Sequence, residues 1–197
     1  YNVKAFTNYD NMKHIILQGG GYSLPIDLIG RNIKVNGIEF YIPHGNRKNK
    51  KPKCDAVACR GQSINLDGKY NQIYILAGAV SEEDIVGTFK IDRKDYNINF
   101  KSMTAPYSKW DMYGLGQTAH TDDETAFGYE FTHLHHPEGN LVKKARMYLY
   151  SLNVKNKKRL RFPNNNKLVI FAMTSAEKEE FTNLADNVID IVDDNYD

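Results

Sequence analysis

The chain is poor in cysteine, with only Cys54 and Cys59 among its 197 residues. In a regular strand the two side chains would point to opposite faces, so free thiols are expected rather than a disulfide. Two cysteines at this spacing also have no second pair to complete a tetrahedral zinc site. The chain also has no run of about 18 apolar residues, and a membrane-spanning helix is therefore not expected.

An excess of one charge is lacking as well, because 26 Lys and Arg face 24 Asp and Glu for a net charge of +2. So small an imbalance gives no global field that would recruit nucleic acid, and no nucleic-acid partner is expected. Two local basic patches occur, at residues 47–53 and 155–161. They are typical of a solvated loop and of a strand edge protected by Lys. A protein-interaction or adhesion surface at the first patch is left as an alternative.

Patterns typical of β-strands fill most of the chain, which holds 13 Tyr and 9 Phe. Alternating apolar residues flank Asn36-Gly37 within residues 33–42 and predict a β-hairpin that starts the sheet. Residues 72–80 are apolar on both faces and predict a central strand. Further strands are expected at 56–64, 86–91, 96–100, 129–135, 145–154, 160–162 and 168–173. The pattern predicts an all-β, antiparallel, jelly-roll-like β-sandwich over residues 1–174.

The tail from residue 175 to residue 197 shows a helical pattern in place of the strand patterns of residues 1–174. Thr174 and Glu177 have the spacing of a capping box, and apolar residues follow at helical intervals through Phe181, Leu184 and Val188. The sequence therefore predicts a C-terminal amphipathic helix that ends in an acidic tail.

Six segments of the chain resemble segments of one protein family and occur in the same order as in that family. They are residues 57–62, 70–76, 87–92, 109–111, 132–135 and 166–174. Together they resemble the C-terminal β-sandwich region of bacterial α-mannosidases of glycoside hydrolase family 38, over roughly residues 5–175. The resemblance implies an accessory domain whose partner is a mannose-containing glycan or a catalytic domain of the same polypeptide. In that family the nucleophilic Asp and the zinc site belong to a separate N-terminal barrel, which nothing in this chain matches. The compartment is left open, with an extracellular or cell-surface location favoured.

The cluster of His133, His135 and His136 is the constellation with ligand chemistry, and His133 and His135 are its candidate ligand-binding residues. In a strand they share one face, about 7 Å apart at Cα, close enough for both imidazoles to reach one ion or one sugar. His120 and Asp122 are candidates to join them as metal ligands. A metal site, a polar ligand site and a purely structural role all remain open. Calcium or zinc is left open as a cofactor, because no complete motif for either ion is present.

A long loop over residues 101–126 contains the sole tryptophan. The rings of Trp110, Tyr107 and Tyr113 are suited to stacking on the apolar face of a pyranose, while Asp111 or Gln117 bonds its hydroxyls. The alternative is that Trp110 plugs the open end of the sandwich.

The sequence thus favours a non-catalytic carbohydrate-binding or accessory module, and no catalytic residue is assigned. No Gly-x-Ser-x-Gly nucleophile elbow occurs. The alternative from another class is a small hydrolase or lyase in which His133 or His135 acts as general base.

Overall fold

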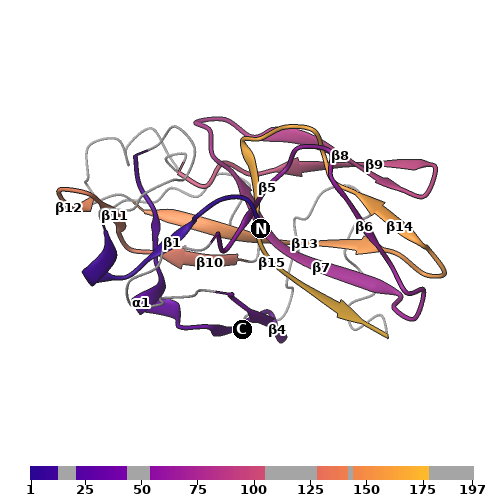
Figure 1. Ribbon diagram of the computed structural model, residues 1–197, viewed down its shortest axis with the longest axis horizontal. Coiled ribbons are helices and arrows are strands. Elements are labelled where there is room, and N and C mark those ends of the chain that lie inside the picture. The colour runs from indigo at the N-terminus through magenta and orange to yellow at the C-terminus, as the bar shows by residue number, and fades with distance from the viewer. Residues whose placement is uncertain (13–20, 44–53, 105–127, 142–143, 178–197) are drawn as a thin grey trace, which may run out of the picture.

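A computed structural model describes residues 1–12, 21–43, 54–104, 128–141 and 144–177 (Figure 1). The strands are β1 (Phe6–Thr7), β2 (Leu24–Pro25), β3 (Asn32–Val35), β4 (Ile38–Tyr41), β5 (Val57–Ala58), β6 (Ser63–Asn65), β7 (Gln72–Ala79), β8 (Ile85–Ile91), β9 (Lys94–Phe100), β10 (Gly128–Phe131), β11 (Leu134–His136), β12 (Gly139–Leu141), β13 (Ala145–Asn153), β14 (Arg159–Arg161) and β15 (Leu168–Ala176). One helix, α1 (Ile26–Ile29), and one 3-10 turn, η1 (Tyr9–Asn11), accompany them. The all-β sandwich expected from the sequence is confirmed. Neither of these two helical elements in the described part of the chain is long and apolar enough to cross a membrane.

Two antiparallel sheets form the sandwich. The larger has the order β10-β13-β7-β15-β5 and the smaller the order β6-β14-β8-β9. An inter-sheet core fills the space between them, and its larger members are Ile75, Phe89, Phe100, Tyr150 and Leu168. In Figure 1 the smaller sheet occupies one end of the molecule, and β11 and β12 occupy the other.

The second face of the larger sheet is also covered. An N-terminal core, which includes Phe6, Phe40, Leu76, Leu134 and Phe171, joins this face to β1, the β3–β4 hairpin and β11. Strand β7 therefore lies between two apolar cores, and all of its residues are buried. This explains why its sequence is apolar on both faces and confirms the expected central strand.

The hairpin expected at Asn36-Gly37 is present as β3 and β4. Asn36 and Gly37 have φ angles of 46° and 79°, the left-handed pair that a two-residue turn of this type requires. The hairpin does not start the main sheet, because it forms a separate two-stranded sheet. Its buried face, Ile33, Val35, Ile38 and Phe40, instead packs into the N-terminal core.

Two expected strands are interrupted. The strand expected at 56–64 is divided between β5 and β6, which lie in different sheets, because Gly61 turns the chain at a φ of 72°. The strand expected at 129–135 is divided into β10 and β11 by Thr132 and His133. At the C-terminal end, β15 runs to Ala176, so the helix-capping role expected of Thr174 is wrong. The expected helix from Phe181 onward lies outside the described residues.

Both cysteines are free thiols, as expected, and they differ sharply in accessibility. Cys54 is exposed, whereas Cys59 lies in the inter-sheet core, where burial raises the pKa of its thiol to about 12. Because the thiolate is the reactive form, Cys59 stays protonated and inert at neutral pH. We expect DTNB to titrate one thiol in the folded protein and a second only in denaturant. Cys54→Ser should leave no fast-reacting thiol, and rapid reaction of both thiols in the folded chain would contradict this assignment.

Candidate functional site

The two predicted histidines meet at the end of the sandwich where β11 and β12 form a short hairpin. His135 lies in β11 and is fully buried, while His133 lies in the break between β10 and β11. The assumption that both belong to one continuous strand is therefore wrong. Their rings nevertheless lie side by side, with centroids 5.7 Å apart and an interplanar angle of 39°.

Tyr9 completes this group from the N-terminal segment. Its ring centroid lies 4.9 Å from that of His135 and 6.5 Å from that of His133. The Tyr9 amide donates to Oδ2 of Asp27 on α1 at 3.0 Å, which fixes the backbone of η1. The Tyr9 side chain remains 52% exposed. We call Tyr9, His133 and His135 the histidine–tyrosine cluster.

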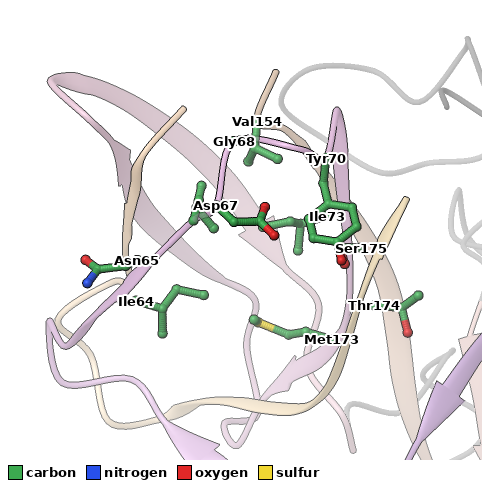
Figure 2. A pocket seen from close by; sticks show the side chains of 11 residues that line it. Ile64, Asn65, Asp67, Gly68, Tyr70, Ile73, Val154, Met173, Thr174 and Ser175 are labelled. Atoms are coloured by element: carbon green, nitrogen blue, oxygen red, sulfur yellow. The ribbon is translucent and has the colours of Figure 1, made fainter. Parts of the chain in front are cut away.

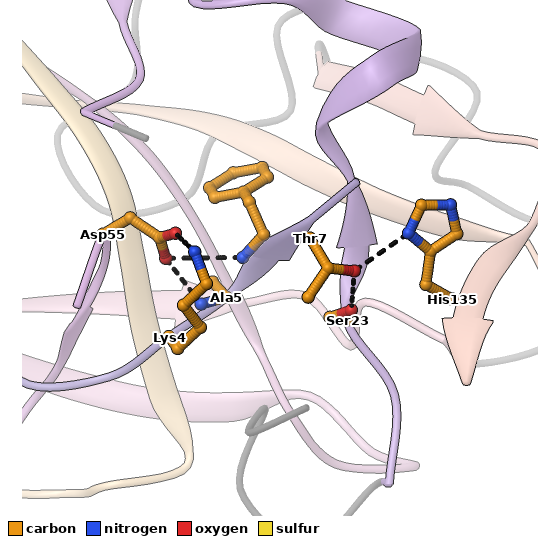
Figure 3. Close-up of polar contacts among 7 residues, drawn as sticks. Lys4, Ala5, Thr7, Ser23, Asp55 and His135 are labelled. Carbon is orange, nitrogen blue, oxygen red and sulfur yellow. Dashed lines mark hydrogen bonds and ion pairs between the residues drawn. The ribbon is translucent and has the colours of Figure 1, made fainter. Parts of the chain in front are cut away.

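A chain of buried hydroxyls holds His135 in place. Its Nδ1 is hydrogen-bonded to Oγ1 of Thr7 at 2.9 Å, and Thr7 Oγ1 is bonded in turn to Oγ of Ser23 at 2.5 Å (Figure 3). The backbones of Ser23 and His135 also exchange two hydrogen bonds, of 2.9 and 3.0 Å. On the neighbouring ring, His133 Nδ1 lies 3.3 Å from Oγ1 of Thr132. Both imidazoles are thus engaged through Nδ1.

The pKa of His135 is lowered below its ordinary value. Burial is the largest cause, and the proximity of His133 adds to it, while the Asp27 carboxylate and the backbone of Thr7 act in the opposite direction. The side chain is therefore neutral at neutral pH. A neutral imidazole presents either a donor or a lone pair at Nε2, depending on which nitrogen carries the proton.

The Nε2 atoms of the two rings are the unusual feature of the cluster. Both are buried, and within the described residues neither has a hydrogen-bond partner. The side-chain oxygen of Asn8, next to Tyr9, is in the same state. Leaving a buried polar group unsatisfied costs about 1–3 kcal/mol, so two such atoms on neighbouring rings call for an explanation, and a ligand that bonds them is one.

A family model described as an AziU2-like beta-sandwich domain matches residues 1–179. The chain belongs to this family. The match supports the predicted β-sandwich and shows no link to the α-mannosidases. A search of curated proteins found no match for this AziU2-like domain.

The remaining predicted site residues of the AziU2-like domain lie outside the described residues. They are the proposed stacking and hydrogen-bonding residues Trp110, Tyr107, Asp111, Tyr113 and Gln117, and the weak metal candidates His120 and Asp122. Within the described ranges, no group of three or more His, Cys, Asp or Glu is arranged to hold a metal ion.

Tyr9, Thr7 and Ser23 were not predicted as site residues. Thr7 lies 128 residues from His135 in the sequence, so no local pattern connects them. They meet because β1 pairs in parallel with β2, with Thr7 opposite Pro25, and because Ser23 bridges to His135. The contact between these residues therefore follows from how the strands pair, and a local sequence pattern does not reveal it.

A different hollow of about 260 Å³ lies at the other end of the AziU2-like domain, between the β6–β7 connection and β15 (Figures 1 and 2). Its walls are largely apolar, from Ile64, Leu66, Ile73, Val154 and Met173. Asp67 and Tyr70 are the titratable groups among its lining residues. The hollow thus combines apolar walls with polar side chains, whereas the histidine–tyrosine cluster has buried polar atoms without partners in the described residues.

Proposed function

We propose that this domain is a non-catalytic binding module that takes a hydroxyl-rich ligand, a carbohydrate, at the histidine–tyrosine cluster. The observation that carries the proposal is the pair of buried Nε2 atoms without partners in the described residues, on two imidazole rings beside a half-exposed tyrosine ring. Each of these atoms gains a hydrogen bond when a hydroxyl reaches it, which offsets the cost of leaving it buried and unsatisfied.

The combination of groups suits a sugar. An aromatic ring packs against the apolar face of a pyranose, while polar side chains at its edge bond the hydroxyls. Tyr9 supplies the ring, and the two imidazoles supply the polar edge. Because both Nε2 atoms are covered, a ligand reaches them only when a neighbouring group moves. We assign this movement to the Tyr9 side chain, which packs against both rings and is half exposed.

The ordered resemblance of six segments to the α-mannosidase accessory region favours mannose-containing oligosaccharides as the first ligands to test. It also supports the related role of an accessory domain that packs against a catalytic domain of the same polypeptide. Under that role the same cluster contacts a glycan presented to the catalytic partner.

Replacing Tyr9 by alanine should weaken glycan binding at least tenfold, a loss of about 1.4 kcal/mol, because the stacking surface is removed. Isothermal titration with mannose-containing oligosaccharides measures this change. Tyr41→Ala is the matched control, since Tyr41 is 57% exposed on β4 and is absent from the ring contacts described for the cluster. Equal affinities of the two variants, or no binding by the unaltered chain, would remove the carbohydrate-binding proposal.

A second candidate, a hydrolase or lyase with a histidine as general base, is favoured by one observation. The Thr7–Ser23 hydroxyl chain orients His135 and its lowered pKa keeps it neutral, as a general base requires. The same titration separates the two candidates when the oligosaccharide is recovered and analysed. Intact glycan supports the binding module, whereas products that disappear in His135→Ala support the enzyme.

A further inference from the structure

The Nε2 atoms of His133 and His135 are buried on rings whose other nitrogen is hydrogen-bonded, as is common for histidines that bind metals. We propose that these two atoms bind a divalent transition-metal ion of the zinc class. The inference goes beyond the proposed function, because it concerns the same cluster but requires no carbohydrate.

The hydrogen bonds at the opposite nitrogens support this inference. Histidines that bind metals almost always donate the other ring N–H to an oxygen, which fixes the ring and leaves a lone pair at the ligating nitrogen. His135 has Thr7 Oγ1 at 2.9 Å from Nδ1, and that hydroxyl is held by Ser23. His133 has Thr132 Oγ1 at 3.3 Å from Nδ1. Both rings can therefore direct a lone pair through Nε2.

The spacing of the rings fits one shared ion. A zinc–nitrogen distance of about 2.0–2.1 Å and tetrahedral angles place the centres of two ligating imidazoles about 5 Å apart. The observed separation between the centroids is 5.7 Å. The two rings are therefore close enough for one ion to lie between them, and the proposal requires both Nε2 atoms to turn toward it.

The sign of the nearby charge favours a cation over an anion. Asp27, whose carboxylate accepts from the Tyr9 amide at 3.0 Å, is the acidic group that acts on His135. The hydrogen bonds described for the cluster involve no Lys or Arg. A divalent ion is attracted to this surrounding, whereas an anion would be repelled by the carboxylate.

The two nitrogens supply only part of a coordination shell, and because both are buried, a neighbouring group must move before an ion enters. In the described part of the chain no third His, Cys, Asp or Glu joins the pair. Water or oxygen atoms of a bound ligand must complete the four-coordinate shell that zinc prefers. Imidazole nitrogen suits zinc and copper and disfavours calcium and magnesium, which prefer oxygen.

The test is a titration of the full chain, free of any histidine tag, with Zn²⁺ alone. We expect one ion per chain, and His133→Ala should weaken its binding at least tenfold. His136→Ala is the matched control, because His136 lies on the same hairpin, with Nδ1 accepting from the Glu138 amide at 3.3 Å. Binding that is unchanged in His133→Ala, or no binding at millimolar Zn²⁺, overturns the inference. Since no glycan is present, a failure of carbohydrate binding does not alter this result.

A spectroscopic measurement guards against a variant that misfolds. In the unaltered protein, Cu²⁺ should give an electron paramagnetic resonance spectrum with coupling to two imidazole nitrogens. Zn²⁺ should shift the Nε2 resonances of His133 and His135 together in imidazole nitrogen NMR spectra. Shifts confined to other histidines of the chain would overturn the assignment even if an ion binds.

Discussion

Replacing Asp55 by alanine is expected to lower the free energy of unfolding by about 3–5 kcal/mol, the cost of breaking a buried ion pair. Asp55 is fully buried, and its Oδ2 lies 2.8 Å from Nζ of Lys4, which is itself buried. Its Oδ1 accepts from the amides of Ala5 at 2.6 Å and Phe6 at 3.3 Å (Figure 3). Alanine removes the carboxylate from these three donors, one of which carries a charge.

Urea unfolding of the variant and the unaltered chain measures this loss. The control is Asp95→Ala, which breaks the exposed Lys90–Asp95 pair of 3.4 Å, whose side chains are 53% and 54% exposed. Exposed pairs contribute about 0–1 kcal/mol, so the control should remain close to the unaltered protein. If both variants lose the same stability, Asp55 does not have the anchoring role assigned to it.

The Asp55 contacts also connect stability to the site. They fix the backbone where β1 begins, and β1 carries Thr7 into contact with Ser23 and His135. An isolated antiparallel β-bridge between Val3 and Ala56 holds the backbone of the same N-terminal segment. The geometry of the histidine–tyrosine cluster therefore depends on the contacts of Asp55, which lie outside the cluster.

Local patterns were sufficient to predict the sandwich strands. Apolar residues on both faces of 72–79 predicted a strand buried on both sides, and the two cores of the molecule account for that burial. Asn36-Gly37 predicted a tight hairpin because few other residue pairs adopt two successive left-handed conformations. In both cases the decisive information lies within a few residues.

Features set by distant contacts were not predictable in this way. The break after β10 is an exception, because the apolar alternation shifts phase between Phe131 and Leu134, a sign that the prediction of one continuous strand overlooked. The layer formed by β1, β2 and the hairpin depends on a parallel pairing between Phe6–Thr7 and Leu24–Pro25. The histidine pair was visible in the sequence, but Tyr9 and the Thr7–Ser23 chain became visible only with this topology.

The division into two cores allows the last prediction to separate stability from binding. Phe100 is fully buried in the inter-sheet core, with its ring 4.9 Å from Tyr150 and 6.0 Å from Phe89. A Cβ added at Gly87 would approach the Phe100 ring to 2.8 Å, so the ring is closely surrounded. Phe100→Ala leaves a cavity in this packing and should lower the free energy of unfolding by about 3–5 kcal/mol.

Val86→Ala is the matched control, because Val86 lies on the neighbouring strand β8 but is 64% exposed and should cost about 0.5 kcal/mol or less. Denaturant unfolding compares the two variants. The histidine–tyrosine cluster lies beyond the larger sheet, next to the N-terminal core, to which Leu134 belongs. Folded Phe100→Ala should therefore keep the Zn²⁺ affinity of the unaltered chain. A folded variant that loses this affinity would show that the two faces of the larger sheet are coupled, contrary to the separation of the two cores.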